Sequence, residues 1–142
     1  MTDCYDWRFI NGSTSNGIYR INPGYGLEPF DVYCDMITDG GGWTIIQRYI
    51  EVVSLYSFYP FRRVDDSLEF YNNTWQQYKV GFNNGIDNSN LWLGNDRIHV
   101  MSSQSNVTLR IEINGDRWLN PNPNPNIYLY GTYNFSVNMI ST

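Results

Sequence analysis

The sequence predicts an α+β domain, built mostly of antiparallel strands with short helices. Short segments in which apolar and polar residues alternate recur along the chain, and several of them end at glycine, proline or asparagine turn signals. Only two segments space their apolar residues as a helix does, and each is only about two turns long. The protein has 142 residues, of which 42% are hydrophobic, so it is long enough for one domain with a sizeable core.

Three strands are expected in the first half of the sequence, at Gly17–Asn22, Phe30–Met36 and Trp43–Arg48. The first alternates and stops at a proline–glycine turn signal. The second alternates again and places Cys34 on its apolar face. The third has an apolar centre, which predicts that it is buried on both sides there.

Two short helices are expected, at Trp75–Gly81 and Gly94–Met101. The first places its tryptophan, Tyr78 and Phe82 near one face, and its closing glycine is a C-cap candidate. In the second, Asn95 is the expected N-cap, and an aspartate follows in the first turn. Helices this short depend on tertiary packing.

The clearest strand of the second half is Val107–Ile113, in which every second residue is apolar. It ends at Asn114-Gly115, a strong turn signal. Two further strands are expected at Ile127–Tyr130 and Tyr133–Val137.

Two stretches are interpreted as insertions. Ile50–Asp66 is aromatic and then basic. Its aromatic rings are expected to cover apolar surface, and the alternative is a saccharide site. Asn120–Asn126 has the sequence NPNPNPN. Alternating proline favours extended or turn conformations, so a stiff hairpin connection is expected there rather than a binding motif.

The composition excludes some function classes. The net charge of −5 does not fit a basic nucleic-acid surface. No apolar run approaches the roughly 20 residues that span a bilayer. The opening residues, MTDCYDWRFI, do not resemble a signal peptide, yet the cysteines and sequons favour an exported protein.

Cys4 and Cys34 lack the CxxC spacing of a zinc or redox motif. Two cysteines cannot form a structural zinc site alone, so a disulfide is the natural interpretation, and two buried thiols are the alternative. A disulfide here would stabilise the fold by roughly 3–4 kcal/mol. N-x-S/T sequons begin at four asparagines: Asn11, Asn72, Asn106 and Asn134.

Three consecutive glycines, Gly40, Gly41 and Gly42, precede Trp43. Glycine tolerates positive φ and close backbone approach, so a tight turn or bulge is expected here. This turn would deliver Trp43 into the core as a buried anchor. The glycines do not match a phosphate-binding pattern.

The sequence offers little support for catalysis. The single histidine, His99, lies on a short expected helix beside apolar residues, which favours a structural role. The pairs Asp65-Asp66 and Asp35/Asp39 are expected to be surface acids rather than the carboxylates of a glycosidase. A secreted hydrolase is therefore the least supported of the function hypotheses.

The segment Gly85–Asp96 is rich in oxygen side chains, as a calcium-binding loop is. It lacks the alternating ligands, the glycine at the sixth place and the glutamate at the twelfth that the calcium-loop template requires. We expect no metal site and no cofactor in this protein.

Val32–Arg48, with the sequence VYCDMITDGGGWTIIQR, closely resembles the signature of the fibrinogen C-terminal domain family. Other segments resemble family segments in the same order, at Asn16–Gly24, Phe70–Asn84, Leu91–Gln104 and Val107–Ile113. The resemblance implies the family's fold, and it pairs Cys4 with Cys34 as the family's first disulfide. It also implies structural roles for Gly40, Gly41, Gly42, Trp43, Trp92, Gly94 and His99.

The sequence stops at Thr142, whereas the family's domain continues into a calcium loop, a second disulfide and a ligand pocket. Residues 1–142 are therefore expected to form a partial domain, incomplete at the C-terminus, with an exposed strand edge that favours self-association. The resemblance implies an extracellular, secreted, non-enzymatic module for lectin-like recognition, adhesion or receptor binding. Its expected partners are glycans or protein receptors. The alternative is a truncated structural or partner-binding fragment without that pocket.

Overall fold

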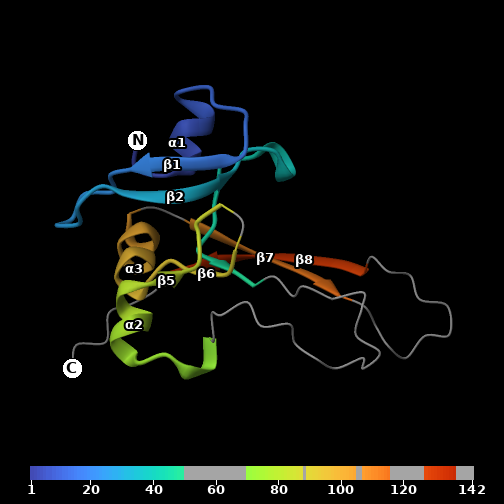
Figure 1. The fold of residues 1–142 in the computed structure, drawn as a ribbon. Helices are drawn as coiled ribbons and strands as arrows, with labels where there is room; N and C mark the ends of the chain where they lie inside the picture. The colour runs from blue at the N-terminus through green and yellow to red at the C-terminus, as the bar shows by residue number, and fades with distance from the viewer. Residues whose placement is uncertain (50–69, 88, 105–106, 116–126, 137–142) are drawn as a thin grey trace, which may run out of the picture. The chain divides into compact units, whose positions relative to one another are not determined.

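A computed structural model describes residues 1–49, 70–87, 89–104, 107–115 and 127–136. The protein divides into two compact units, residues 1–101 and 102–142, which are described separately (Figure 1). Both predicted insertions, 50–66 and 120–126, lie wholly outside the described residues, as do the Asp65-Asp66 pair and Asn106. Within the described part of the sequence, no helix is both long and apolar enough to span a bilayer.

The fold begins with helix α1 (Cys4–Phe9), which the sequence pattern does not predict. Asp3 is its N-cap, and its Oδ1 accepts a hydrogen bond from the backbone N–H of Asp6 at 2.9 Å. Burial raises the pKa of Asp3, and that hydrogen bond opposes the shift. A helix of six residues is too short to show an apolar stripe in the sequence. The N-cap aspartate is therefore the one local signal for this helix.

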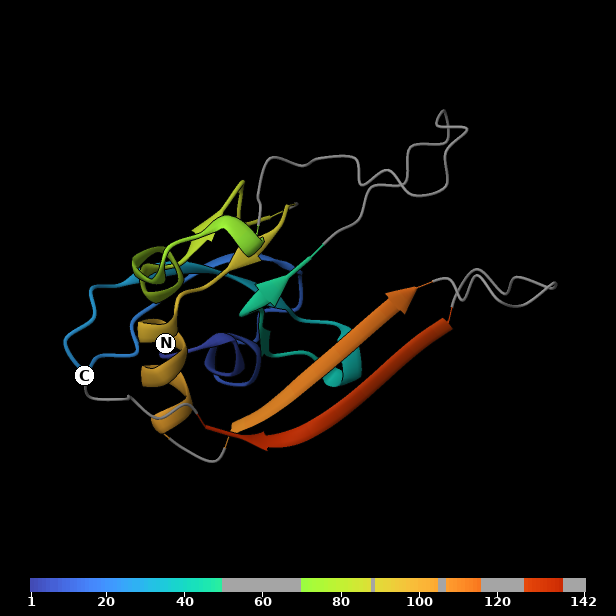
Figure 2. The same cartoon turned by 90° about the horizontal axis from the view of Figure 1, so that it is seen from below.

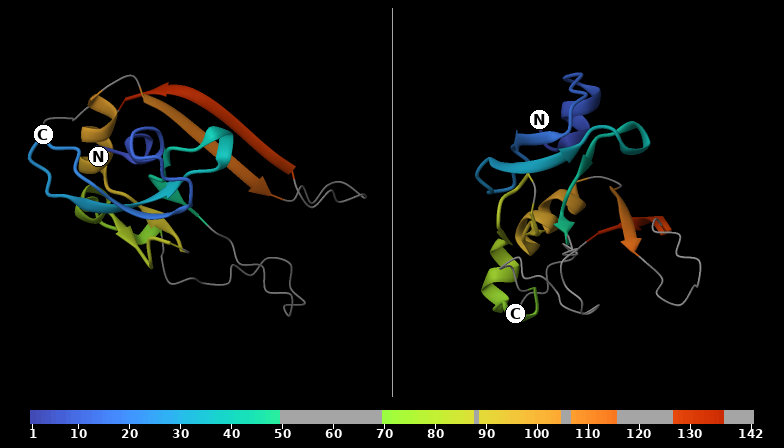
Figure 3. Two further views of the ribbon diagram at one scale, coloured as in Figure 1. Left: turned by 90° about the horizontal axis from the view of Figure 1, so that it is seen from above. Right: turned by 45° about the vertical axis from the view of Figure 1, so that its right-hand side comes forward.

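The first sheet of the N-terminal unit has the order β1-β2-β3, with antiparallel neighbours. Its strands are β1 (Gly17–Ile21), β2 (Phe30–Asp35) and β3 (Trp43–Thr44). Every second residue of β2 is buried, which confirms the predicted alternation. Both views in Figure 3 show β1 and β2 side by side with α1 close to them.

The prediction of a single strand at Trp43–Arg48 is wrong. The segment divides into β3 and β4 (Gln47–Arg48), which belong to different sheets. The N–H of Ile45 donates to the carbonyl oxygen of Tyr33, while the carbonyl oxygen of Ile46 accepts from Leu93. The two isoleucines are half-buried because the backbone passes from one sheet to the other between them.

The second sheet has the order β4-β6-β5, with β6 (Leu91–Trp92) between β4 and β5 (Phe82–Asn83). A short 3-10 turn, η2 (Phe70–Asn72), and helix α2 (Trp75–Val80) precede β5. The predicted helix is therefore confirmed.

Two caps fix the ends of α2. Thr74 and Gln77 form a capping box at its start. Gly81 is its C-cap, as predicted, with φ +102°. An ideal Cβ at Gly81 would lie 2.5 Å from the carbonyl oxygen of Leu93, so glycine lets the helix end meet the strand backbone.

Helix α3 (Asn95–Ser103) begins one residue later than predicted. Asn95 is its first helical residue rather than its cap, which corrects the prediction. Gly94 precedes it with φ +106°, and an ideal Cβ there would lie 2.4 Å from the carbonyl oxygen of Val80. The Arg97 guanidinium lies 4.6 Å from the centre of the Phe30 ring, and burial lowers the pKa of Arg97.

The core of the N-terminal unit joins α1, both sheets and α3. Its buried apolar residues are Cys4, Ile21, Phe30, Val32, Cys34, Met36, Leu91, Leu93 and Ile98. The disulfide between Cys4 and Cys34 lies within this core, with both residues fully buried, and ties α1 to β2.

The C-terminal unit contains a two-stranded antiparallel ribbon, β7 (Val107–Gly115) and β8 (Ile127–Phe135), seen clearly in Figure 2. The prediction of two strands between residues 127 and 137 is wrong, because β8 is continuous. The predicted turn at Asn114-Gly115 is also wrong, since both residues pair with β8. An asparagine–glycine pair favours a turn but does not require one, and here cross-strand pairing with β8 holds both residues in the strand.

Candidate recognition surface

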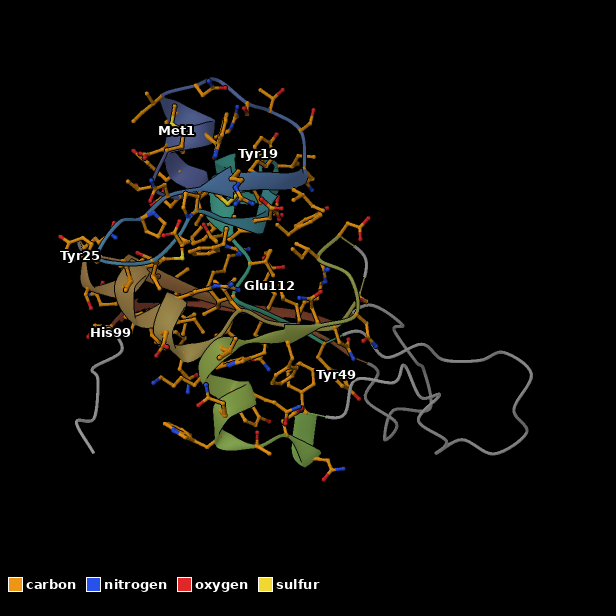
Figure 4. All side chains as sticks on the ribbon, turned by 60° about the vertical axis from the view of Figure 1, so that its left-hand side comes forward. Met1, Tyr19, Tyr25, Tyr49, His99 and Glu112 are labelled. Atoms are coloured by element: carbon orange, nitrogen blue, oxygen red, sulfur yellow. A yellow bond between two sulfur atoms is a disulfide. The ribbon has the colours of Figure 1, made fainter. Side chains whose placement is uncertain are left out.

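Among the described residues, no group of three or more histidine, cysteine, aspartate or glutamate side chains could hold a metal ion. His99 is half-buried on α3 (Figure 4). Cys4 and Cys34 are joined in a disulfide, so neither is available as a nucleophile.

Asp35 stabilises the glycine turn. Its Oδ1 accepts hydrogen bonds from the backbone N–H groups of Ile37, at 2.9 Å, and Thr38, at 3.0 Å. Asp39 is exposed in the 3-10 turn η1 (Thr38–Gly40). This geometry fits the expectation that Asp35 and Asp39 are surface acids.

The three glycines all have positive φ, as a tight turn requires. Trp43 follows them and donates from Nε1 to the carbonyl oxygen of Thr38 at 2.9 Å. Trp43 is only half-buried, so the prediction of a buried anchor is wrong. Its hydrogen bond closes the turn, and we expect its truncation to cost less than the roughly 3–5 kcal/mol of a fully buried tryptophan.

Helix α1 leaves an apolar end exposed. Tyr5 and Phe9 are 59% and 54% exposed, and their ring centroids lie 4.5 Å apart. Ile10 follows them and is 70% exposed. Arg8 holds the helix against the glycine turn, because its Nε donates to the carbonyl oxygen of Gly40 at 2.9 Å.

Arg48 binds the oxygen-rich loop that resembles a calcium site in composition. Its Nε donates to the carbonyl oxygen of Ser89 at 2.7 Å, and its Nη2 donates to that of Ile86 at 2.6 Å. Burial lowers the pKa of Arg48, while Tyr33 and Asp87 oppose that shift. The guanidinium thus satisfies two carbonyl oxygens of this loop.

Replacing Arg48 with glutamine is expected to lower the free energy of unfolding by about 2 kcal/mol, because two part-buried carbonyl groups lose a charged donor. Urea unfolding measures the change. The matched control is Arg20→Gln, which removes an exposed ion pair with Asp31 and an exposed hydrogen bond to the carbonyl oxygen of Pro29, and should cost less than about 1 kcal/mol. Equal costs for the two variants would contradict the assigned role of Arg48.

An aromatic cluster anchors α2 to the second sheet. Edge-to-face ring contacts link Phe82 with Phe70 and with Tyr78, and link Tyr78 with Trp92. The hydroxyl of Tyr78 donates to the carbonyl oxygen of Phe70, and Nε1 of Trp92 donates to that of Tyr78 at 2.9 Å. Tyr49 extends the cluster, with its ring centroid 5.9 Å from that of Phe70 (Figure 4).

Trp75 is not part of this cluster. It is the first residue of α2 and is 71% exposed, so the prediction that it lies near one face with Tyr78 and Phe82 is only partly right. Gln76 and Gln77 are exposed beside it. Helical spacing alone does not distinguish the side of a short helix that packs from the side that faces solvent.

The sequence matches the family model described as the C-terminal globular domain of the fibrinogen beta and gamma chains, over residues 1–121. It is 40% identical to human fibroleukin over 111 residues and 39% identical to techylectin-5A of Tachypleus tridentatus over 114 residues. Among solved structures, the fibrinogen-like globe domain of human ANGPTL2 superposes with a TM-score of 0.72 at 28% identity.

These matches cover most of this protein but only part of each relative. They include 78% of this sequence and 21% of fibroleukin, and 79% of this sequence and 34% of techylectin-5A. The ANGPTL2 match covers 96% of this sequence and 52% of that domain. The fibrinogen-like fold expected from the sequence is therefore confirmed.

Proposed function

This protein belongs to the family of the C-terminal globular domain of the fibrinogen beta and gamma chains, and we propose that it is a non-enzymatic recognition module that acts outside the cell. One of its relatives is named as a lectin. The buried disulfide suits an oxidising compartment. The expected partners are glycans or protein receptors.

The observation that carries the proposal is the exposure of Trp75 on an anchored helix. An indole that is 71% exposed leaves a large apolar ring in water without contributing to the core. The capping box and the aromatic cluster hold α2 in place, so little ordering of the helix would be needed when a ligand binds. Tryptophan is also enriched among the residues that dominate binding energy.

The neighbouring side chains suit a polar ligand with an apolar face. Gln76 is exposed and offers an amide donor and acceptor, while the amide oxygen of Gln77 is held in the capping box by the N–H of Thr74. Lys79, one turn after Trp75, adds a positive charge on the same side of the helix. A pyranose ring or an extended peptide could stack on the indole and bond to these groups.

Replacing Trp75 with alanine is expected to weaken binding to an immobilised glycan or receptor by at least about 2 kcal/mol, roughly 30-fold. Its effect on the free energy of unfolding should stay within about 0.5 kcal/mol, because the side chain packs on little. Glycan-array binding and surface plasmon resonance measure the first quantity, and urea unfolding the second.

Tyr25→Asn is the matched control, since Tyr25 is 80% exposed but lies in the turn after β1. It should leave binding unchanged. Binding that is equally weakened by both variants would argue against α2 as the recognition surface. Self-association or a protein partner without any glycan binding would favour the alternative of a partner-binding fragment.

A further inference from the structure

The end of α1 combines a sequon with exposed apolar side chains. We propose that Asn11 carries an N-linked glycan and that the first sugar of this glycan packs on the apolar end of α1, formed by Tyr5, Phe9 and Ile10. The sequon is Asn11-Gly12-Ser13, which begins two residues after Phe9. This proposal rests on the proposed function in one respect, because the protein must pass through the secretory pathway to be glycosylated.

The backbone of the sequon is fixed by the C-terminus of α1. The N–H of Asn11 donates to the carbonyl oxygen of Asp6 at 3.0 Å, and the N–H of Ser13 donates to that of Trp7 at 2.9 Å. Gly12 lies between them with φ +84°, and no atom lies within 4 Å of the position a Cβ would take. The sequon is therefore held firmly at a site with open space around it.

The Asn11 side chain is exposed and oriented. The hydroxyl of Ser13 donates to its Oδ1 at 3.1 Å, which fixes the amide group through its oxygen. The amide nitrogen Nδ2, the atom that becomes glycosylated, is the other end of that group. A glycan attached there requires no rearrangement of the core, because Asn11 is exposed.

The neighbouring apolar surface gives the sugar a place to pack. Phe9 and Ile10 are 54% and 70% exposed, and the Tyr5 ring contacts that of Phe9 in a tilted arrangement. Two residues of backbone span at most about 7 Å, so a pyranose on Asn11 lies within reach of the Phe9 ring. The C–H groups on one face of the sugar would cover ring surface that water otherwise contacts.

The other described sequons lack this combination. In the sequon of Asn72, the hydroxyl of Thr74 accepts a hydrogen bond from Gln77 as the cap of α2. Asn134 lies within β8, where it pairs with Thr108 of β7. Among the described sequons, that of Asn11 combines three features. Its amide accepts a hydrogen bond from the Ser13 hydroxyl, its turn is open at Gly12, and the exposed rings of Tyr5 and Phe9 lie nearby.

The reaction needs a glycosyl donor of the secretory pathway, a lipid-linked oligosaccharide diphosphate. Nδ2 of Asn11 attacks the anomeric carbon of the first sugar, and a nitrogen–carbon bond forms. The bond between that carbon and the diphosphate oxygen breaks, and its electron pair leaves with the lipid diphosphate. One amide proton is released to a base, so charge and atoms balance.

The test begins with site occupancy. The full-length protein, fused to a cleavable secretion leader, is produced in a eukaryotic secretory host and collected from the medium. A peptide-N-glycosidase in ¹⁸O-water converts each glycosylated asparagine to labelled aspartate, which peptide mass spectrometry locates. We expect the label at Asn11 in most molecules. Ser13→Ala should remove the label at Asn11 alone, and Ser13→Thr should retain it.

Packing is tested on glycoprotein trimmed to one sugar per site. Ring currents should shift proton resonances of the Asn11 sugar upfield, and Phe9→Leu should remove most of that shift. Tyr25→Asn should leave it unchanged. Sugar resonances at the positions of a free glycopeptide, in the wild-type protein, would overturn the packing.

The outcomes separate this proposal from the proposed function. A secreted protein labelled at Asn72 or Asn134 but not at Asn11 would overturn the Asn11 assignment and leave export intact. Glycoprotein labelled at Asn11 that binds no glycan or receptor would overturn the proposed function and leave the Asn11 assignment intact.

Discussion

Replacing Gly41 with alanine is expected to lower the free energy of unfolding by more than about 4 kcal/mol. An ideal Cβ on this backbone would lie 2.1 Å from the carbonyl oxygen of Met36 and 2.3 Å from its carbonyl carbon. Met36 is 1% exposed, so it cannot move aside without disturbing the core. Gly41 also has φ +82° and ψ −173°, a region that is nearly restricted to glycine.

The neighbouring Gly40 provides the matched control. It has φ +91°, but no atom lies within 4 Å of its ideal Cβ. Gly40→Ala therefore costs only the backbone strain, about 1–2 kcal/mol. Thermal and urea unfolding of the two variants measure the difference, and equal destabilisation would show that the contact with Met36 is not the cause. Because the total stability of a domain is about 5–15 kcal/mol, the Gly41 variant is expected to populate unfolded molecules at physiological temperature.

The sequence predicts the elements whose pattern is local. The alternation of β2 is confirmed because that strand buries every second residue, and the helix at α2 is confirmed with its glycine C-cap. The tight turn at residues 40–42 is also predictable from its three glycines, because few other residues adopt positive φ. Which backbone atom approaches Gly41 is a tertiary property, and no local pattern indicates it.

The errors arise where tertiary contacts override local pattern. β3 and β4 are separate strands because their connecting residues are hydrogen-bonded in opposite directions. Ile45 donates to Tyr33 of the first sheet, and Ile46 accepts from Leu93, which follows β6 of the second sheet. The short helix α1 depends on its cap and on the Cys4–Cys34 disulfide rather than on an apolar stripe.

The candidate recognition surface was harder to predict than the fold. An exposed tryptophan and a core tryptophan look alike in sequence, so the helical spacing of Trp75 does not indicate that its side chain is 71% exposed. The half-burial of Trp43 illustrates the same point. Arg48 was not identified because its two carbonyl partners lie far along the sequence, at separations of 38 and 41 residues.

Removing the disulfide with the double substitution Cys4→Ala and Cys34→Ala is expected to lower the free energy of unfolding by about 3–4 kcal/mol. The bond joins residues 30 apart in the sequence, and breaking it releases a long loop in the unfolded state. Both cysteines are fully buried, so alanine avoids leaving a hydroxyl or a single thiol in the core.

Other contacts determine how far α1 detaches when the bond is lost. The N–H of Cys4 donates to Oγ1 of Thr44 at 3.2 Å, and Nε1 of Trp7 donates to the carbonyl oxygen of Arg20 at 3.0 Å. These hydrogen bonds contribute only about 1 kcal/mol each, so they cannot replace the disulfide. We therefore expect hydrogen exchange to accelerate first in α1, ahead of β2.

A reductant distinguishes the disulfide from the packing of the two side chains. Reduction should lower the melting temperature of the wild-type protein toward that of the double variant, and it should leave the double variant unchanged. If the double variant melted at the wild-type temperature with α1 still protected from exchange, the helix would be held by its hydrogen bonds and apolar contacts alone.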